Sequence, residues 1–562
     1  MLVLVLLTIG ACLAFFGWGR LLYAALVRAG FRGATPSGPD QALLGVLLLT
    51  WLAVSINFFA PLTEWSGVVV LGAGLVFFAW PGTNKQGNRV FVIAVLACAA
   101  YFSFRIVRYQ ASYDAGLYHV PFIKWMTQHA VPFGLANLEE RFGFNSAWLA
   151  LHAALRLPYV GWTTLSAVEA AVWALGACAV IEGAAFRWRT FPPVQRALAF
   201  AIGILLMLFA IRWGARSVGS TDNAPNLFAV LAALFFVESS AHARKGEPRE
   251  RARALLLLVA CSCLAVTGRL SMLPIAVLPL VALLPGPREA SDRSTLFAVV
   301  SVGSLFVALW VLRNIVISGC LAFPVAMTCV DGISWGAGSA RAATLAADIS
   351  VYVARHLSGE MPELEPHPWV PRFVQELLTN KTSIYLIVLL LGGMWAAARL
   401  SWTSGRTRAA GVEVLRTREH SALVFATLFG LALWIAAAAH VRFSWSFLLL
   451  ALLPVYGYAL AAVDIEQRMA ALVRFLRRKP AAWGLVAICV ALVAVRVAQY
   501  PAWSLTLPEA ELRIVRVEPG AYPIYAPKQG DQCWDAPLPC APYLRPGLEV
   551  DRFAGRLRFK YQ

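Results

Sequence analysis

Residues 1–27 read MLVLVLLTIGACLAFFGWGRLLYAALV, and this stretch decides the fold. Its only charged side chain is Arg20, and about 20 consecutive apolar residues are what an α-helix needs to cross the hydrocarbon core of a bilayer. The stretch has no basic start of the kind that precedes the apolar core of a cleaved signal peptide, and it is longer than such a core. We therefore expect a first membrane span that is retained.

Apolar runs of the same length recur along the whole chain of 562 residues, almost to residue 500. Hydrophobic residues make up 59% of the chain and charged residues 14%, and the mean hydropathy is +0.67. Soluble domains, by contrast, are about one quarter charged. The composition excludes a soluble globular domain and predicts an all-α, polytopic transmembrane helical bundle.

About fourteen runs of roughly 20 residues can be counted along the chain. Their centres lie near residues 14, 51, 73, 99, 174, 204, 232, 262, 277, 304, 391, 430, 455 and 490. They define a membrane domain over residues 1–499 and a tail over residues 500–562. The tail is rich in proline and alternates apolar and polar residues in ELRIVRV (511–517), which predicts a few short strands rather than another helix.

The net charge of +18 can reflect either nucleic-acid binding or membrane topology. Nucleic-acid binding would gather the basic residues on one helix or in one patch, whereas here they fall in alternate short loops, as the positive-inside rule requires. These loops hold Arg28 and Arg32, Lys85 and Arg89, Arg187 and Arg189, Arg244 to Arg253, Arg288 and Arg293, Arg399 to Arg418, and Arg468 to Lys479. We expect the loops to face the cytoplasm, both termini to face the periplasm of a bacterial inner membrane, and no nucleic acid to bind.

Three segments on the predicted periplasmic side are long enough to hold a functional site: residues 109–162, residues 313–381 and the tail. Four of the ten cysteines lie in these segments, in an oxidising compartment. An even pair in a small, loop-rich tail predicts a disulfide between Cys533 and Cys540, and Cys320 is a candidate partner for Cys329. Zinc is not expected, because no histidine flanks the tail pair at ligand spacing.

The first of these segments concentrates polar residues beside a membrane face. They are Asp114, Tyr118, His119, Lys124, Arg141 and Asn145. For the later members an ordinary polar loop is an equally simple interpretation. Asp114 differs, because it follows the fourth predicted span by a few residues and lies among aromatic residues, where a buried carboxylate needs a reason.

Further charged residues lie at the same ends of later spans. Asp222 stands between Arg216 and the start of a span, where it could instead cap the following helix. Arg269 occupies the tip of a tight predicted hairpin, and Arg313 and Arg442 lie near the outer ends of two other spans. An arginine in such a place either extends to the headgroups or binds a lipid phosphate with its two-pronged guanidinium group.

Several enzyme classes are not supported by the sequence. It has no GxxxxGK[ST] phosphate loop, no HExxH zinc helix and no GxSxG elbow. It also lacks a soluble domain able to bind a nucleotide. If the protein is a transferase working on the periplasmic side, its activated donor must therefore arrive in the membrane.

Asp114 in the first large loop, Asp222 in the next, the basic hairpin tip at Arg269 and the late Arg442–Phe443 pair resemble the pattern of the GT-C class of glycosyltransferases. This class includes protein O-mannosyltransferases and the lipid A aminoarabinose transferase. The tail motif GDQCWDAPLPC (530–540) is similar to that of a less-characterised bacterial branch. The chain departs from some relatives by having more spans and an extra hairpin before the catalytic loop.

The resemblance implies a GT-C-like bundle that transfers a sugar, with inversion, from a polyprenyl-phosphate donor to a glycan, lipid or protein acceptor in the periplasm. It makes Asp114 the general base and Asp222 a second catalytic candidate. The candidate substrate-binding residues are Tyr118, His119, Lys124, Arg216, Arg269, Arg313 and Arg442. A divalent cation between the two aspartates stays open, although two carboxylates without histidine are a weak metal signal.

Two other functions compete with this one. A flippase or transporter of lipid-linked glycans would be expected to show inverted repeats and polar residues at the membrane midplane, whereas the polar residues here gather on one face of rather clean spans. An O-antigen ligase or polymerase would use arginine, histidine and carboxylate side chains on the same face, so the sequence leaves it open.

Overall fold

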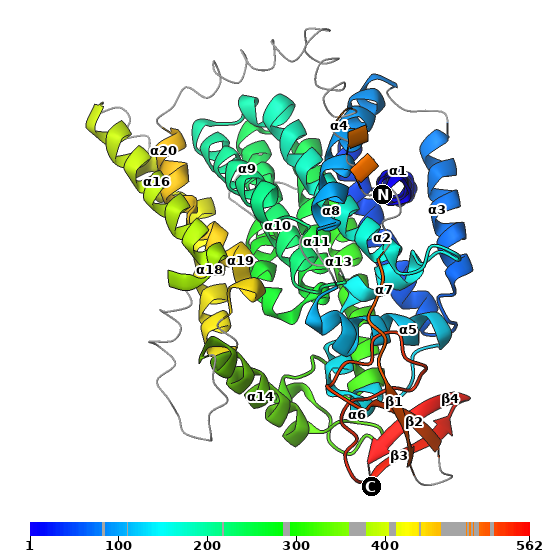
Figure 1. Cartoon of the computed structure of the whole chain (residues 1–562). Helices are drawn as coiled ribbons and strands as arrows, with labels where there is room; N and C mark the ends of the chain where they lie inside the picture. The colour runs from blue at the N-terminus through cyan, green and yellow to red at the C-terminus, as the bar shows by residue number, and fades with distance from the viewer. Residues whose placement is uncertain are drawn as a thin grey trace.

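The computed structural model is a helical bundle with a small strand-bearing tail at one end (Figure 1). It describes residues 1–80, 85–108, 111–215, 219–284, 293–358, 378–403, 412–437, 440–461, 505–517 and 522–561, together with a few positions between 491 and 499. All bounds and contacts below refer to these residues.

Ten of the described helices are long and apolar enough to cross a membrane, so the protein is a multi-pass integral membrane protein. The long helices are α1 (Leu2–Arg28), α2 (Gly38–Asn57), α8 (Thr163–Glu182), α9 (Pro193–Trp213), α10 (Asn223–Lys245), α11 (Pro248–Gly268), α13 (Arg293–Ser318), α16 (Lys381–Thr403), α18 (Arg418–Ala437) and the pair α19 (Val441–Leu450) and α20 (Leu453–Ala461). Shorter apolar helices are α3 (Glu64–Ala79), the part Phe91–Ile106 of α4 (Lys85–Ile106), and η5 (Leu270–Ala276) with α12 (Val277–Leu283). The span expected near residue 490 lies largely outside the described residues.

Close backbone contacts bring the first helices together. A Cβ atom on Gly45 of α2 would lie 1.8 Å from the carbonyl oxygen of Phe15, and one on Gly17 of α1 would lie 1.9 Å from that of Gly74 in α3. No side chain fits at either position. Small residues at such crossings are typical of membrane helices, whose association depends on close packing because lipid is as apolar as the helices themselves.

The tail face is the end of the bundle formed by residues 111–162, 319–338 and 505–561. Figure 1 shows the strands of the tail at this end, near α5 (Val120–Gln128), α6 (Leu135–Leu138) and α14 (Ser339–Ser358). The tail is joined to it through the backbone, since the Phe133 N–H donates to the Leu557 carbonyl (3.0 Å) and the Phe559 N–H donates to the Phe133 carbonyl (2.9 Å).

The strands predicted in the tail are confirmed. The described part of the tail contains two antiparallel pairs, β1 (Leu512–Val517) with β2 (Tyr522–Pro527) and β3 (Leu548–Phe553) with β4 (Arg556–Tyr561). Their registers pair Leu512 with Pro527 and Leu548 with Tyr561. The alternating segment 511–517 thus forms β1, as its pattern indicated.

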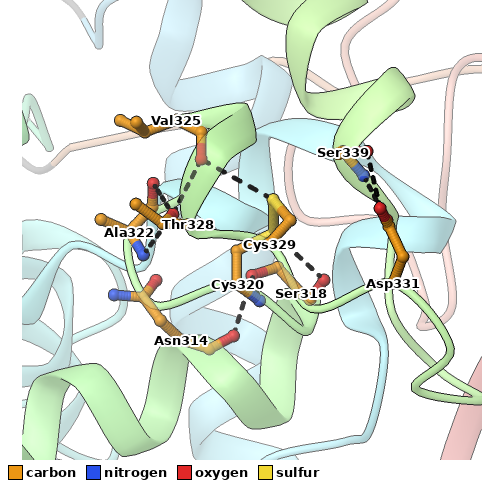
Figure 2. Close-up of a disulfide and its surroundings, with 9 residues drawn as sticks. All are labelled: Asn314, Ser318, Cys320, Ala322, Val325, Thr328, Cys329, Asp331 and Ser339. Atoms are coloured by element: carbon orange, nitrogen blue, oxygen red, sulfur yellow. Dashed lines mark hydrogen bonds between the residues drawn. A yellow bond between two sulfur atoms is a disulfide. The ribbon is translucent and has the colours of Figure 1, made fainter.

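Both expected disulfides are present. Cys533 is joined to Cys540 in the tail, and Cys320 to Cys329 in the loop after α13. Figure 2 shows the loop that is closed by the Cys320–Cys329 disulfide. In this loop the Thr328 hydroxyl forms hydrogen bonds with the carbonyls of Ala322 and Val325. In the same view the Asp331 carboxylate accepts hydrogen bonds from the Ser339 N–H (2.8 Å) and hydroxyl (2.9 Å), which fixes the first residue of α14.

One helix of the tail face is internal. The apolar residues of the segment 145–157 recur at helical spacing, and the helix there, α7 (Ala147–Ala154), has every side chain buried. Its Trp148 and Leu151 are 2% and 0% exposed. Because α7 is apolar on all sides, it is an internal helix of the bundle rather than a surface helix.

A buried charge network lies at the opposite face of the bundle. Its centre is formed by Asp40, Arg187, Glu238 and Arg253, which join the first turn of α2, the turn after α8, the second half of α10 and the start of α11. Arg253 pairs with both carboxylates, and Arg187 lies 3.3 Å from Asp40 and 3.2 Å from Glu238. At the rim of the network Arg187 also pairs with Glu182 (3.0 Å) and Arg253 with Glu250 (2.9 Å). The sequence had placed the two arginines in loops facing the cytoplasm, whereas the structure buries them against acids from distant helices.

Candidate functional site

Asp114 lies at the tail face, directly before a wide helical turn. That turn, η1 (Ala115–His119), is π-helical and continues into α5. The Asp114 carboxylate oxygen Oδ2 lies 3.1 Å from Nη2 of Arg442, and its side chain is 19% exposed. π-Turns are rare and are frequent at functional sites, so the local backbone agrees with the choice of Asp114 as a site residue.

Asp222 precedes α10 and reaches the same place. Its Oδ1 pairs with Nη1 of Arg269, and its Oδ2 lies 3.8 Å from Nε of Arg442. The carboxylate makes no capping hydrogen bond to α10. The alternative that Asp222 serves only as a helix cap is therefore not what the structure contains, and its side chain is available to the arginines.

The two arginines come from separate helix ends and share one aromatic ring. Arg269 joins α11 to η5, and its Nε donates to the Ser271 hydroxyl (3.1 Å). Arg442 is in the first turn of α19. The guanidinium carbons of Arg269 and Arg442 lie 4.3 Å and 4.6 Å from the centroid of the Phe443 ring. The negative face of the ring and the two carboxylates together allow two cations to lie close to each other.

Asp114, Asp222, Arg269 and Arg442 form what we call the charged tetrad. Formally it carries no net charge. Its side chains are 11% to 40% exposed, with Asp222 the least and Arg442 the most accessible. The tetrad is therefore reachable from outside the protein, and an incoming anion can compete with the carboxylates for the two guanidinium groups.

Tyr118 and His119 lie beside the tetrad as neutral groups. The His119 Nε2 lies 3.3 Å from the hydroxyl of Thr221, the neighbour of Asp222, and the Tyr118 and His119 rings meet edge to face at 4.1 Å. Burial lowers the pKa of His119 to about 4. Burial, reinforced by the charge of Asp114, raises the pKa of Tyr118 to about 12. Neither group changes its charge near neutral pH, so the formal charges at this place come from the tetrad.

The structure does not bring the remaining candidates to the tetrad. Lys124 instead holds the tail, since its Nζ donates to the Asp535 carboxylate and to the carbonyls of Asp535 and Ala536, each at 2.9 Å. Arg313 is 1% exposed and donates to Asn145 Oδ1 (2.6 Å) and Asn57 Oδ1 (3.0 Å). Arg216 lies outside the described residues.

The arrangement does not fit a divalent cation between the two aspartates. Both carboxylates already face guanidinium groups, so a metal ion placed between them would lie beside Arg269 and Arg442. Among the residues that the structure describes, no group of three or more His, Cys, Asp or Glu side chains is placed to hold a metal ion.

Sequence reasoning missed three contributors to the site. Phe443 was noted only as half of a pair, and Thr221 was assigned no role in the site. Trp534 was quoted within the tail motif, although its ring lies on Gly116. A tryptophan inside a short disulfide loop was the one available signal, because so large an apolar residue in a small polar loop has to pack against something.

The fold and the tetrad together define the class of protein. It is a multi-pass membrane protein with a partly exposed charged tetrad at one end of its helical bundle. The chain belongs to the family described as "Domain of unknown function (DUF8201)", whose model matches residues 1–449. The matched region contains the whole tetrad but not the tail. Comparisons with curated proteins and with solved structures gave no match.

Proposed function

We propose that the protein is a glycosyltransferase that moves a sugar from a polyprenyl-phosphate-linked donor to a glycan, lipid or protein acceptor, with inversion at the anomeric carbon. The observation that carries the proposal is the convergence of Asp114, Asp222, Arg269 and Arg442. These residues come from four separate segments, and the sequence alone makes each of them a candidate. They supply two carboxylates and two guanidinium groups, the groups that this chemistry needs.

Each member of the tetrad has a role in this reaction. The acceptor hydroxyl oxygen attacks the anomeric carbon as the bond from that carbon to the donor phosphate oxygen breaks. The hydroxyl proton passes to Asp114, and the electron pair of the broken bond leaves with the lipid phosphate. Arg269 and Arg442 stabilise the charge that develops on this phosphate, while Asp222 orients both arginines.

The ion pairs with Asp114 and Asp222 hold both arginines in place when no sugar donor is bound. A buried or half-buried guanidinium group without a partner is costly, and the carboxylates meet that need. Arg442 is the most exposed member, so it is the one we expect to turn toward the phosphate. That movement separates it from Asp114 and leaves the carboxylate free to accept a proton.

The same proposal places the protein in a bacterial inner membrane with fourteen spans and with the tail face in the periplasm. The support is the alternation of basic loops along the chain, which assigns the ends of the helices to two sides. Reporter fusions at residues 35, 245, 410 and 475 should read cytoplasmic, and a fusion after the tail should read periplasmic. A cytoplasmic signal from the tail would overturn this orientation.

The test of the function is sugar transfer from a labelled polyprenyl-phosphate donor in proteoliposomes. Asp114→Asn keeps the shape of the side chain but cannot accept the proton, so transfer should fall by about 10²-fold or more. Asp331→Asn is the matched control, because Asp331 is also a carboxylate at the tail face but bonds to Ser339. Full transfer by Asp114→Asn at matched protein levels would exclude the mechanism and favour a flippase.

A further inference from the structure

A loop of the tail covers the turn that carries Asp114. We call residues 530–540 the tail loop. The Trp534 N–H donates to the Gly116 carbonyl (2.9 Å), and the Trp534 ring lies on Gly116 itself. A Cβ atom on Gly116 would be 2.4–2.6 Å from three ring atoms of Trp534. Trp534 is 8% exposed, so its ring is largely buried in this contact.

The tail loop also contacts the chain on the other side of Asp114. The Tyr113 hydroxyl lies 2.6 Å and 2.5 Å from the two carboxylate oxygens of Asp531. Gln532 Nε2 donates to the Tyr113 carbonyl (2.8 Å). Contacts from the loop therefore flank Asp114, one residue before it and two residues after it.

The tail loop is itself fixed at two further points. The Asp535 carboxylate binds Lys124 of α5 and accepts a hydrogen bond from Trp162 Nε1 (2.9 Å). The Cys533–Cys540 disulfide closes the loop on both sides of Trp534, and both cysteines are 1% exposed. A loop closed in this way loses little freedom when its tryptophan docks, because the disulfide has already restricted it.

From these contacts we infer that Trp534 is a positioning residue for Asp114: the tail loop fixes the Tyr113–Gly116 turn, and with it the carboxylate that accepts the proton. The inference rests on the proposed function. It assigns a role to a part of the chain outside residues 1–449, which match the family. The tail thus contributes to the site, although it lies at the other end of the sequence from Asp114.

The contacts of the tail loop make its positioning role specific to Asp114, the proposed general base. Arg269 and Arg442 are carried by the ends of α11 and α19, and none of the contacts of the tail loop described above involves them. A loose tail loop should therefore displace Asp114 and leave the phosphate-binding groups in place. Displacement of a reacting group by about 1 Å can cost 10²-fold in rate, whereas donor affinity should hardly change.

A double-mutant cycle separates positioning from general damage. Trp534→Ala should lower kcat by about tenfold or more and change the KM for the donor by less than about twofold, and Trp534→Phe should restore part of the rate. Gly116→Ala should be harmful in the wild type, because its methyl group meets the Trp534 ring. In the Trp534→Ala background the same change should cost less than about twofold, because the obstacle is gone.

Amide hydrogen exchange over residues 111–119 gives a second measurement that needs no activity. Trp534→Ala should speed exchange there, whereas Trp65→Ala, which removes a 63% exposed tryptophan of α3, should not. If Trp534→Ala does not fold, Tyr113→Phe removes the hydroxyl that bonds to Asp531 and should act in the same direction, more weakly.

The outcomes are distinct. Faster exchange with a lower kcat and an unchanged KM supports the inference. Unchanged exchange overturns it, as does faster exchange with an unchanged kcat, and additive effects in the cycle would also overturn it. If the wild-type protein transfers no sugar, the proposed function fails on that result alone. Exchange then decides whether the loop fixes the turn: faster exchange supports this contact and unchanged exchange overturns it.

Discussion

The charged tetrad and the buried charge network are two ion clusters at opposite ends of one bundle. The tetrad and the centre of the network each have two carboxylates and two arginines, although Glu182 and Glu250 add two carboxylates at the rim of the network. Each cluster has one member within or next to α10 and one within or next to α11. Asp222 and Glu238 are separated by 16 positions, as are Arg253 and Arg269, and 16 residues of helix rise about 24 Å. The clusters therefore lie most of a membrane thickness apart and do not touch.

The two clusters differ in how far their side chains are exposed. In the buried network, Asp40 and Glu238 are 0% exposed at the side chain, Arg253 is 2% and Arg187 is 14% exposed. In the tetrad every side chain is more than 10% exposed, and Arg442 reaches 40%. The same four charges thus make a closed internal contact at one end and an open site at the other. The carboxylates show the difference most clearly, because Asp40 and Glu238 are 0% exposed whereas Asp222 and Asp114 are 11% and 19% exposed.

The largest expected effect is the loss of an arginine from the buried network. Arg253→Ala would leave Asp40 and Glu238 buried with one cation fewer, and breaking a buried pair in this way costs about 3–5 kcal/mol. Thermal unfolding of the purified protein in detergent measures the loss. Arg249→Ala is the matched control on the same helix, because Arg249 is exposed and should change stability by less than about 0.5 kcal/mol.

Arg253→Ala should also leave little assembled protein in the membrane, whereas Asp114→Asn should leave normal amounts. If Arg253→Ala were as stable as Arg249→Ala, the network would not hold α2, α10 and α11 together. The two clusters would then not differ in how much they contribute to the stability of the protein.

A smaller effect is expected for Arg269 in the tetrad. Its guanidinium group can bind a phosphate with two parallel hydrogen bonds, whereas lysine offers a single ammonium group. Loss of one charge-assisted hydrogen bond costs about 1.5–3 kcal/mol, so donor use by Arg269→Lys should weaken by roughly 10- to 150-fold. Binding of a labelled polyprenyl-phosphate sugar to the folded variant is the measurement. Unchanged binding by Arg269→Ala would show that this arginine only pairs with Asp222.

Those features of the fold that depend on local chemistry could be predicted from the sequence. Apolar length predicted the helices, alternation predicted β1, and cysteine placement predicted both disulfides. The tetrad was also accessible to this reasoning, because each of its members lies at a helix end and a charge beside the membrane is conspicuous. What could not be predicted was which charges meet, since that depends on packing between segments far apart in the sequence.

Two residues show the limit. Lys124 was a substrate-binding candidate because it lies in the same polar segment as Asp114, but its partner Asp535 is 411 positions away in the tail. Arg253 was counted among solvent-facing loop charges, but its partner Asp40 is 213 positions away in α2. Neither ion pair can be recognised from the local sequence. A charged residue at a helix end has the same sequence neighbours whether its side chain faces water or an acidic residue of another helix.

The smallest expected effect concerns acid and His119, and it tests whether the tail face is the acid-sensitive end. The folded pKa of His119 is about 4 because burial disfavours the charged ring, and an unfolded histidine has a pKa near 6.5. Above about pH 6.5 both states are neutral and the residue contributes no pH dependence. Between about pH 6.5 and 4 the unfolded state binds a proton that the folded state does not, so stability falls as the pH falls.

The slope is at most about 1.4 kcal/mol per pH unit. His119→Gln keeps a polar group near Thr221 and removes the titration, so its melting temperature should decline less steeply over this range than that of the wild type. The groups around the ring are Asp114, Arg269, Arg442 and the buried His152, whose pKa burial lowers to about 3. His152 acts with the same sign, so His152→Gln should also flatten the curve, and the double variant should flatten it further. Identical slopes in wild type and His119→Gln would mean that the pKa of the ring is the same in the folded and unfolded protein. The interpretation of His119 as a buried, neutral neighbour of the tetrad would then be wrong.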